Sequence, residues 1–332
     1  MKENPFLKAM DICDGTISIV DSSCEVYNRL WCLYEAYKSM IDVEKKRCYK
    51  FDVYTDYVDV SGTHKSVGIT DGYIQRDLKK STRKKKREEE FPLDRILKAI
   101  NLDVSTAVAT ETKDKNFILN EFTGNFTDDI PEEYHTEYEN LNNILRGKFV
   151  VPFLERIIKE EKVLTILFGC LVVFQNSNAD IVDLDLRECK RFTDSLAIYI
   201  FNHLPSTIHS LSIQTNKSSI TSRGISTILK YPTKLPMLTE LILDCNNIST
   251  KHVNDIITII EQNKLLTKLS LNRNQLKYDG VKDIINIVKK SRYLVRLDVR
   301  YNDIGYEGML FLAIAEKQWQ KVNPTIDFDY WY

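Results

Sequence analysis

The chain has 332 residues and a formal net charge of −1 at pH 7. Its length suffices for two domains with separate cores, and its near-zero net charge argues against nucleic acid or an anionic membrane as a partner. The seven cysteines, an odd number without a C-x-x-C pair, indicate reduced thiols and an intracellular, cytoplasmic location. No histidine or cysteine pair has the spacing of zinc ligands, and the longest apolar run, Val163 to Phe174, is too short to span a membrane.

Residues 1–125 are predicted to form a small α/β domain, because helical and strand patterns alternate along them. We expect helices at residues 6–10, 30–40, 91–100 and 113–122, and strands at residues 16–20 and 49–54. Pro92 lies near the first turn of the third helix, and Gly124 follows the end of the fourth.

The segment from Phe6 to Glu35 combines a helix, a buried strand and a second helix that contains Trp31-Cys32-Leu33-Tyr34-Glu35. It resembles part of a Toll/interleukin-1-receptor-type (TIR) domain, which places a Trp-Cys-Leu-x-Glu motif on such a helix. The resemblance implies an incomplete flavodoxin-like fold, since the family's first strand, first helix and second strand would precede Phe6. In the enzymatic members the motif's glutamate, here Glu35, supports cleavage of NAD at the nicotinamide–ribose bond. A carboxylate can stabilise the oxocarbenium-like character that develops there.

Seven of the nine residues from Lys79 to Arg87 are cationic, and three glutamates follow them directly. Such a run is typical of a nuclear-import signal or a phosphate-binding patch, or of a solvated segment that the glutamates neutralise. The lack of interleaved aromatic residues favours the solvated segment. Residues 126–176, which begin acidic and polar, are expected to form a linker and a helical cap.

A pattern recurs every 28 residues in the C-terminal half. Copies of L-x-x-L-x-L-x-x-N begin at Leu238, Leu266 and Leu294 (294 − 266 = 28), the last with Val299 as its third apolar residue. A period of this size predicts a solenoid. The alternating apolar residues indicate a strand with one buried face, and the asparagine amide is expected to bond backbone groups of the following turn. Apolar residues at helical spacing follow each copy.

Two weaker copies precede these three. One contains Ile208, Leu211 and Ile213, and the other contains Ile181, Leu184 and Leu186, with Cys189 in the asparagine position. Gly224, Gly280 and Gly308 keep a common position, which we place just before the helices. The alternation in Ile326-Asp327-Phe328 predicts a last edge strand, with Tyr330, Trp331 and Tyr332 covering the open end.

These repeats resemble leucine-rich repeats of the ribonuclease-inhibitor type, which pair a strand with a full helix. The resemblance implies about five repeats in residues 177–332. The expected fold class is therefore α/β, with a solenoid of parallel strands and outer helices preceded by the smaller α/β domain.

A solenoid offers a long curved surface that commonly binds another protein. We expect the side chains between the strand leucines to form two rows on the concave face. The first row is Asp185, Ser212, Ile242, Ser270 and Asp298. The second row is Arg187, Gln214, Asp244, Asn272 and Arg300, with Arg273 and Tyr301 at its edge. Arginine and tyrosine are frequent hot spots of protein interfaces.

The sequence leaves two functions open. In the first, the chain is an interaction module without cofactor or catalytic residue, either a signalling or immune-type protein or a bacterial effector acting in a host cytosol. In the second, Glu35 of the TIR-like segment cleaves NAD as a substrate, and the repeats regulate or target that activity. Nicotinamide release that is lost on Glu35→Ala would distinguish the second function from the first.

Overall fold

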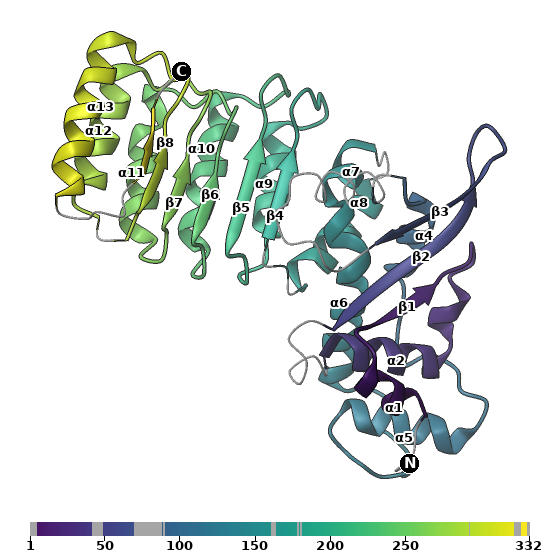
Figure 1. The fold of residues 1–332 in the computed structure, drawn as a ribbon. Helices are drawn as coiled ribbons and strands as arrows, with labels where there is room; N and C mark the ends of the chain where they lie inside the picture. Colours follow the sequence, from purple (N-terminus) through teal and green to yellow (C-terminus); the bar gives the residue numbers. More distant parts are fainter. Residues whose placement is uncertain are drawn as a thin grey trace. The chain divides into compact units, whose positions relative to one another are not determined.

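Figure 1 shows the computed structural model of the chain, which describes residues 5–41, 49–69, 88, 90–160, 164–177, 179, 181–291, 293–321 and 327–330. The basic run from Lys79 to Arg87 lies outside the described residues. The chain divides into two compact units. The first comprises Met1–Phe153 and Phe168–Ser177, and the second comprises Leu154–Leu167 and Asn178–Tyr332.

The first unit mixes helices with a small sheet. Its elements in chain order are α1 (Pro5–Ile12), β1 (Gly15–Ile19), η1 (Glu25–Asn28), α2 (Leu30–Ile41), β2 (Lys50–Val58), β3 (His64–Ile69), α4 (Leu93–Ala99), α5 (Thr112–Phe122), α6 (Thr136–Val150), η3 (Val151–Phe153) and most of α8 (Leu164–Gln175). The elements expected from the sequence are all present, whereas β3 is an additional strand.

The sheet of the first unit has the order β1-β2-β3, with β1 parallel and β3 antiparallel to β2. Phe51, Val53 and Thr55 of β2 are buried on one face, because an alternating strand turns every second side chain to the same side. The β2–β3 connection is a tight turn in which Asp59 Oδ1 accepts the backbone N–H groups of Ser61 and Thr63. A flavodoxin-like sheet is essentially parallel, so the antiparallel β3 departs from the fold that the TIR resemblance implies.

Helix α6, in the range expected to be linker and cap, packs within the first unit. Asn142 Oδ1 accepts the backbone N–H of Val104 at 2.9 Å, and Arg146 Nε donates to the carbonyl of Leu102 at 2.7 Å. These buried bonds hold α6 against the segment that follows α4.

The second unit contains the repeats. Its elements are α7 (Leu154–Glu160), β4 (Ile181–Asp185), α9 (Asp194–Asn202), β5 (Ser210–Gln214), α10 (Ser222–Lys230), η4 (Tyr231–Lys234), β6 (Glu240–Ile242), η5 (Thr250–His252), α11 (Val253–Gln262), β7 (Lys268–Ser270), α12 (Lys277–Val288), β8 (Arg296–Asp298), α13 (Gly305–Gln320) and β9 (Asp327–Asp329). The strands form one sheet in the order β4-β5-β6-β7-β8-β9, parallel throughout. Figure 1 shows the helices stacked along one side of this sheet.

The core of the second unit lies between the sheet and those helices. Leu241, Leu269 and Leu297 pair in register across β6, β7 and β8, and each is almost completely buried. From the helix side, the apolar faces of α11 and α12 cover them with buried isoleucines and valines. Full burial of each such side chain stabilises the fold by about 1.5–3 kcal/mol.

The recurrent glycines lie within the first turn of the helices rather than before them as expected. A Cβ atom at Gly224 of α10 would come 2.3 Å from Asp194 Oδ1, and one at Gly308 of α13 would come 2.8 Å from the Cβ of Ile304. Gly224 and Gly308 therefore have no room for a side chain, whereas at Gly280 the nearest atom, of Val253, would be 3.1 Å from the Cβ.

The predicted last strand, β9, is confirmed by its parallel pairing with β8. After it, Tyr330 is buried and its hydroxyl donates to Glu316 of α13 at 2.9 Å. Trp331 and Tyr332 lie outside the described residues.

An asparagine ladder, defined as Asn246, Asn274 and Asn302, runs through the turns that follow the strands. These side chains are only 1%, 5% and 1% exposed. Asn274 Nδ2 donates at 2.9 Å to the carbonyls of both Leu243 and Leu271, which belong to the preceding repeat and to its own. Its Oδ1 accepts the N–H groups of Asn246 and Ile248, both at 3.0 Å. The expected bonding of these amides to the turn backbone is confirmed.

Candidate protein-binding surface

The open face, defined as the face of β4–β9 opposite the helices, carries the side chains that the sequence placed in two rows. The sheet register corrects the first strand: Asp185 pairs with Gln214, and Asp183 pairs with Ser212. The first row is therefore Asp183, Ser212, Ile242, Ser270, Asp298 and Asp329. Two residues further along each strand, the second row is Asp185, Gln214, Asp244, Asn272 and Arg300.

The expected pairing of β4 with β5 was wrong because the sequence of β4 fits the repeat motif at two positions. Its buried residues Val182, Leu184 and Leu186 alternate without a break, so the motif can be placed at either of two positions. The register pairs Val182 with Leu211, whereas the sequence pattern paired Leu184 with it. A shift of the strand pairing by two residues keeps every side chain on the same face of the sheet. Arg187 is therefore still exposed, but it lies two residues beyond Asp185 of the second row.

Two bidentate ion pairs hold the arginines of this face. Arg187 donates from Nε and a terminal nitrogen to the carboxylate of Asp185 at 2.9 and 2.6 Å. Arg300 donates from Nε and a terminal nitrogen to Asp298 at 3.0 and 2.5 Å. The hydrogen bond from Arg187 lowers the pKa of Asp185 below its usual value. Both guanidinium groups are therefore fixed in direction before any partner arrives.

Asp244 lies near the middle of the open face. Its Oδ1 accepts from the hydroxyl of Ser270 at 2.6 Å and from the backbone N–H of Asn272 at 3.0 Å. Partial burial is the largest effect on this carboxyl and raises its pKa, and the charge of Asp298 acts in the same direction. The Oδ1 atom of Asn272 is buried without a hydrogen-bond partner among the described residues.

A further row, formed by Glu240, Lys268 and Arg296, was missed by the sequence analysis. Glu240 and Lys268 form an ion pair, and Arg296 donates to Asp329 at 2.8 Å. These residues directly precede the second leucine of each repeat, so the two-residue period of a strand could have placed them on the same face.

Comparison with protein-family models gives one match to this unit. The model described as "Leucine Rich repeat" matches residues 262–284 and 290–313, two segments whose starts are 28 residues apart (290 − 262 = 28). These segments are leucine-rich repeats. They contain β7, most of α12, β8 and the start of α13, which form two successive strand–helix pairs. Comparison of the whole chain with curated proteins gives no match.

At the edge of the repeats, the turn after each strand from β4 to β8 contains a residue in the left-handed backbone region. The turn column is defined as Glu188, Lys217, Cys245, Arg273 and Tyr301, with φ values of 62°, 61°, 57°, 54° and 54°. The strand register makes Cys245, Arg273 and Tyr301 equivalent, whereas Lys217 lies two residues beyond the position of Cys245. Lys217 forms an ion pair with Glu188 at 3.2 Å, and the Arg273 guanidinium lies 5.3 Å from the centre of the Tyr301 ring. The sequence analysis placed Arg273 and Tyr301 at this edge.

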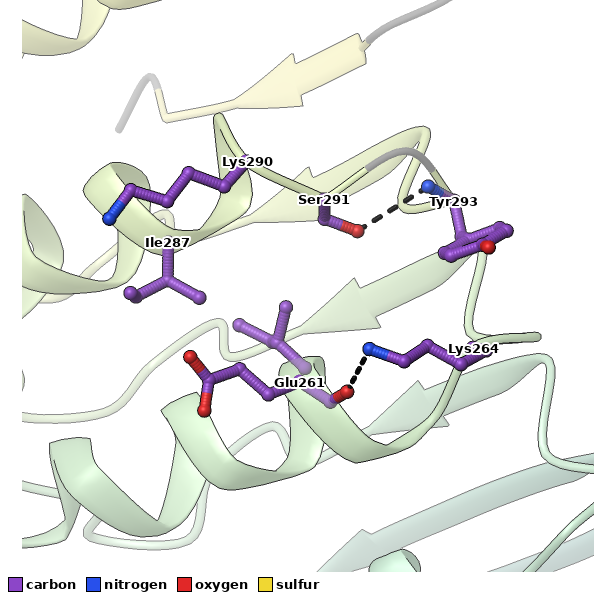
Figure 2. Close-up of a pocket in the computed structure, with 7 residues that line it drawn as sticks. Glu261, Lys264, Ile287, Lys290, Ser291 and Tyr293 are labelled. Carbon is purple, nitrogen blue, oxygen red and sulfur yellow. Dashed lines mark hydrogen bonds between the residues drawn. The ribbon is translucent and has the colours of Figure 1, made fainter.

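The described residues of the second unit line two hollows of interest. One, of about 380 Å³, is lined by Lys159, Asp185, Arg187, Glu188, Asn216, Lys217, Cys245 and Arg273 and adjoins the turn column. The other, of about 210 Å³, lies where α11 and α12 end. Figure 2 shows that Lys264 reaches the carbonyl of Glu261 there, whereas Lys290 points away from its neighbours.

The TIR-like motif lies on α2. Trp31 donates its indole N–H to Asp114 of α5 at 3.1 Å, and the hydroxyl of Tyr34 donates to Glu121 of the same helix. Burial raises the pKa of Glu35, an effect that Arg29 opposes, and burial also raises the pKa of Cys32. Trp31 and Tyr34 therefore act in the packing of α2 against α5, and Glu35 is a half-buried carboxyl beside them.

A serine–histidine pair in the repeats has a structural geometry. His252 is buried, its Nδ1 accepts the backbone N–H of Ser249 at 3.0 Å, and its Nε2 lies 2.9 Å from the hydroxyl of Ser222. Since Nδ1 accepts, Nε2 of the neutral ring carries the proton and donates towards Ser222. A general base needs the opposite arrangement, so this pair connects two repeats rather than activating a nucleophile.

The described residues contain no cluster of three or more side chains suited to holding a metal ion. Within the same residues, no helix has both the length and the apolar character needed to cross a membrane.

Proposed function

We propose that this chain binds a protein partner through the open face of its leucine-rich repeats, and that the repeats are of the ribonuclease-inhibitor type. The proposal is carried by the rows of charged and amide side chains that six parallel strands place on the face opposite the helices. Leucine-rich repeats commonly mediate protein–protein interaction through such a face. The full helices α11 and α12 support the assignment to the ribonuclease-inhibitor type.

The electrostatic pattern of the face supports a partner with mixed charge. Both carboxylates and guanidinium groups occur on the open face, and the pairs of Arg187 with Asp185 and of Arg300 with Asp298 are preformed. A side chain that is already fixed loses less conformational entropy on binding. Arginines held in this way are suitable interface hot spots.

The same ion pairs decide which variants can test the proposal. Reversing Arg187 or Arg300 to glutamate would place two carboxylates side by side, so the repeats themselves would be destabilised. Neutral substitution avoids this repulsion. The test variant is therefore Arg296→Gln/Arg300→Gln, on the open face, and the matched control is Lys264→Gln/Lys290→Gln, which removes two cations from the hollow in Figure 2.

The experiment is quantitative affinity capture from a cell lysate with the full chain and both double variants. A protein retained by the unmodified chain and the control, and lost by Arg296→Gln/Arg300→Gln, identifies the open face as the binding surface. Equal melting temperatures of the two variants exclude loss of fold as the cause. If the open-face variant retains the same proteins as the control, the proposal is wrong.

We propose NAD cleavage as a second candidate function, on the resemblance of the Trp31-Cys32-Leu33-Tyr34-Glu35 motif of α2 to that of TIR domains. In this proposal NAD is the substrate and Glu35 stabilises positive charge that develops on the ribose. Purified full chain is incubated with NAD, and released nicotinamide is measured. Activity that persists in the exposed control Glu111→Gln and disappears in Glu35→Gln supports the proposal, whereas no release above that of buffer refutes it.

A further inference from the structure

The hollow beside the turn column is more basic than the rest of the open face. Four of its lining side chains are cationic, namely those of Lys159, Arg187, Lys217 and Arg273, and two are carboxylates, those of Asp185 and Glu188. The lining thus carries a formal charge of +2 (four cations minus two anions). Its volume of about 380 Å³ is within the range of natural ligand sites, roughly 300–1,000 Å³.

Two of the four cations have acidic partners that hold them firmly. Arg187 is bound bidentately to Asp185, and Lys159 pairs with Glu155 one helical turn away at 2.8 Å. The other two are more available. Lys217 pairs with Glu188 at 3.2 Å, but both side chains are 70% exposed, and such pairs contribute little.

Arg273 is the cation best presented to a ligand. No carboxylate among the described residues forms an ion pair with it, and its guanidinium is stacked over the ring of Tyr301 at 5.3 Å. A guanidinium group over an aromatic ring still has N–H donors for a bidentate contact with a carboxylate.

The repeat spacing selects the shape of the anion. Lys217 follows β5 and Arg273 follows β7, so the repeat of β6 lies between them, and both residues line the hollow. Neighbouring strands lie about 4.8 Å apart, so the two backbone positions are roughly 10 Å apart. A single phosphate can contact both cations only if the two side chains converge on it, whereas two carboxylates on one chain can each meet one cation. An extended peptide covers that separation in three residues, at about 3.3 Å per residue.

We propose that this hollow binds an acidic, extended segment of a protein partner, with one carboxylate on Arg273 and a second, about three residues away, on Lys217. The inference rests on the proposed function and specifies the chemistry of that partner. Glu188 competes with the second carboxylate for Lys217.

The test uses the purified full chain and a fluorescein-labelled peptide with glutamates at its second and fifth positions and glycine elsewhere. Fluorescence anisotropy at low ionic strength measures binding, and a peptide with glutamines instead is the ligand control. We expect Arg273→Gln to weaken binding of the glutamate peptide at least about tenfold. Glu188→Gln should tighten binding several-fold, because Lys217 loses its competitor. Lys290→Gln, from the other hollow, should leave it unchanged.

Three results would overturn the proposal. One is equal affinity of the glutamate and glutamine peptides. Another is a loss in Lys290→Gln as large as that in Arg273→Gln, which would mean that only the overall charge matters. The third is a preference of tenfold or more for a peptide with a single phosphoserine, which would assign the hollow to a phosphate.

The outcome is separable from that of the proposed function, because Arg296 and Arg300 do not line this hollow. The variant Arg296→Gln/Arg300→Gln should bind the acidic peptide as tightly as the unmodified chain. If the captured partner is lost in that variant but retained by Arg273→Gln, the open face is the binding surface and the assignment of the hollow fails alone.

Discussion

Replacing Asn274 by alanine tests whether the asparagine ladder holds the repeats together. Its amide accepts the N–H groups of Asn246 and Ile248 and donates to the carbonyls of Leu243 and Leu271, all within 3.0 Å. Alanine can replace none of these bonds. The side chain is 5% exposed, so water has little access to the groups that lose their partner.

The magnitude follows from the two N–H donors. The carbonyl of Leu271 also accepts from Asn302 at 2.8 Å and so keeps a partner, but the N–H groups of Asn246 and Ile248 are left without their acceptor. A buried donor without a partner costs about 1–3 kcal/mol. We therefore expect Asn274→Ala to lower the free energy of unfolding by roughly 2–6 kcal/mol.

The assay is urea unfolding of the full chain, together with hydrogen exchange of the peptide that contains Asn246 and Ile248. The matched control is Gln275→Ala, next in the sequence but exposed, which should cost under about 0.5 kcal/mol. Asn274→Asp keeps the acceptor and loses the donors, so it should fall between the two. If Asn274→Ala unfolds at the same urea concentration as Gln275→Ala, and the exchange is unchanged, the ladder does not stabilise the repeats.

Three further predictions concern single positions. Gly224→Ala should destabilise the fold by about 1–3 kcal/mol, because its Cβ would clash with Asp194; thermal melting should show no such loss for Gly169→Ala, where there is open space. Burial raises the pKa of Asp244. The stability that comes from its protonated form is therefore present at low pH and lost as pH rises through the pKa of the folded state. Asp244→Asn should raise the melting temperature more at pH 7 than at pH 4, and the opposite order would contradict this. Tyr330→Phe removes a hydrogen bond of 2.9 Å and should cost about 1 kcal/mol in urea unfolding, and no change would mean that water replaces it.

The repeats were predictable because their signal is periodic. A leucine spacing that returns every 28 residues fixes both the strand and its buried face, and the asparagines mark the turns. The register of β4 was not predictable, because Val182, Leu184 and Leu186 alternate evenly and cannot define it alone. The strand β3 was not predicted either, because the segment from His64 to Ile69 is short, begins with three polar residues and becomes a strand by pairing with β2.

The basic hollow could not be found from the sequence. It depends on a left-handed turn that recurs at a glutamate, a lysine, a cysteine, an arginine and a tyrosine. Glycine is the usual sign of that backbone conformation, and none marks these positions. Only the folded sheet shows that the turns after β5 and β7 bring Lys217 and Arg273 to the lining of one hollow.

The asparagine ladder also has a mechanical consequence. Each amide ties its own turn to the preceding repeat, so a force applied at the C-terminus meets one repeat's bonds before those of the next. Pulled from Tyr330 with the N-terminus held, the solenoid should peel in discrete steps. Each step in the regular repeats from β6 to β8 releases 28 residues, and at about 3.4 Å per residue it lengthens the chain by roughly 95 Å. A single-molecule extension trace would therefore count the repeats directly.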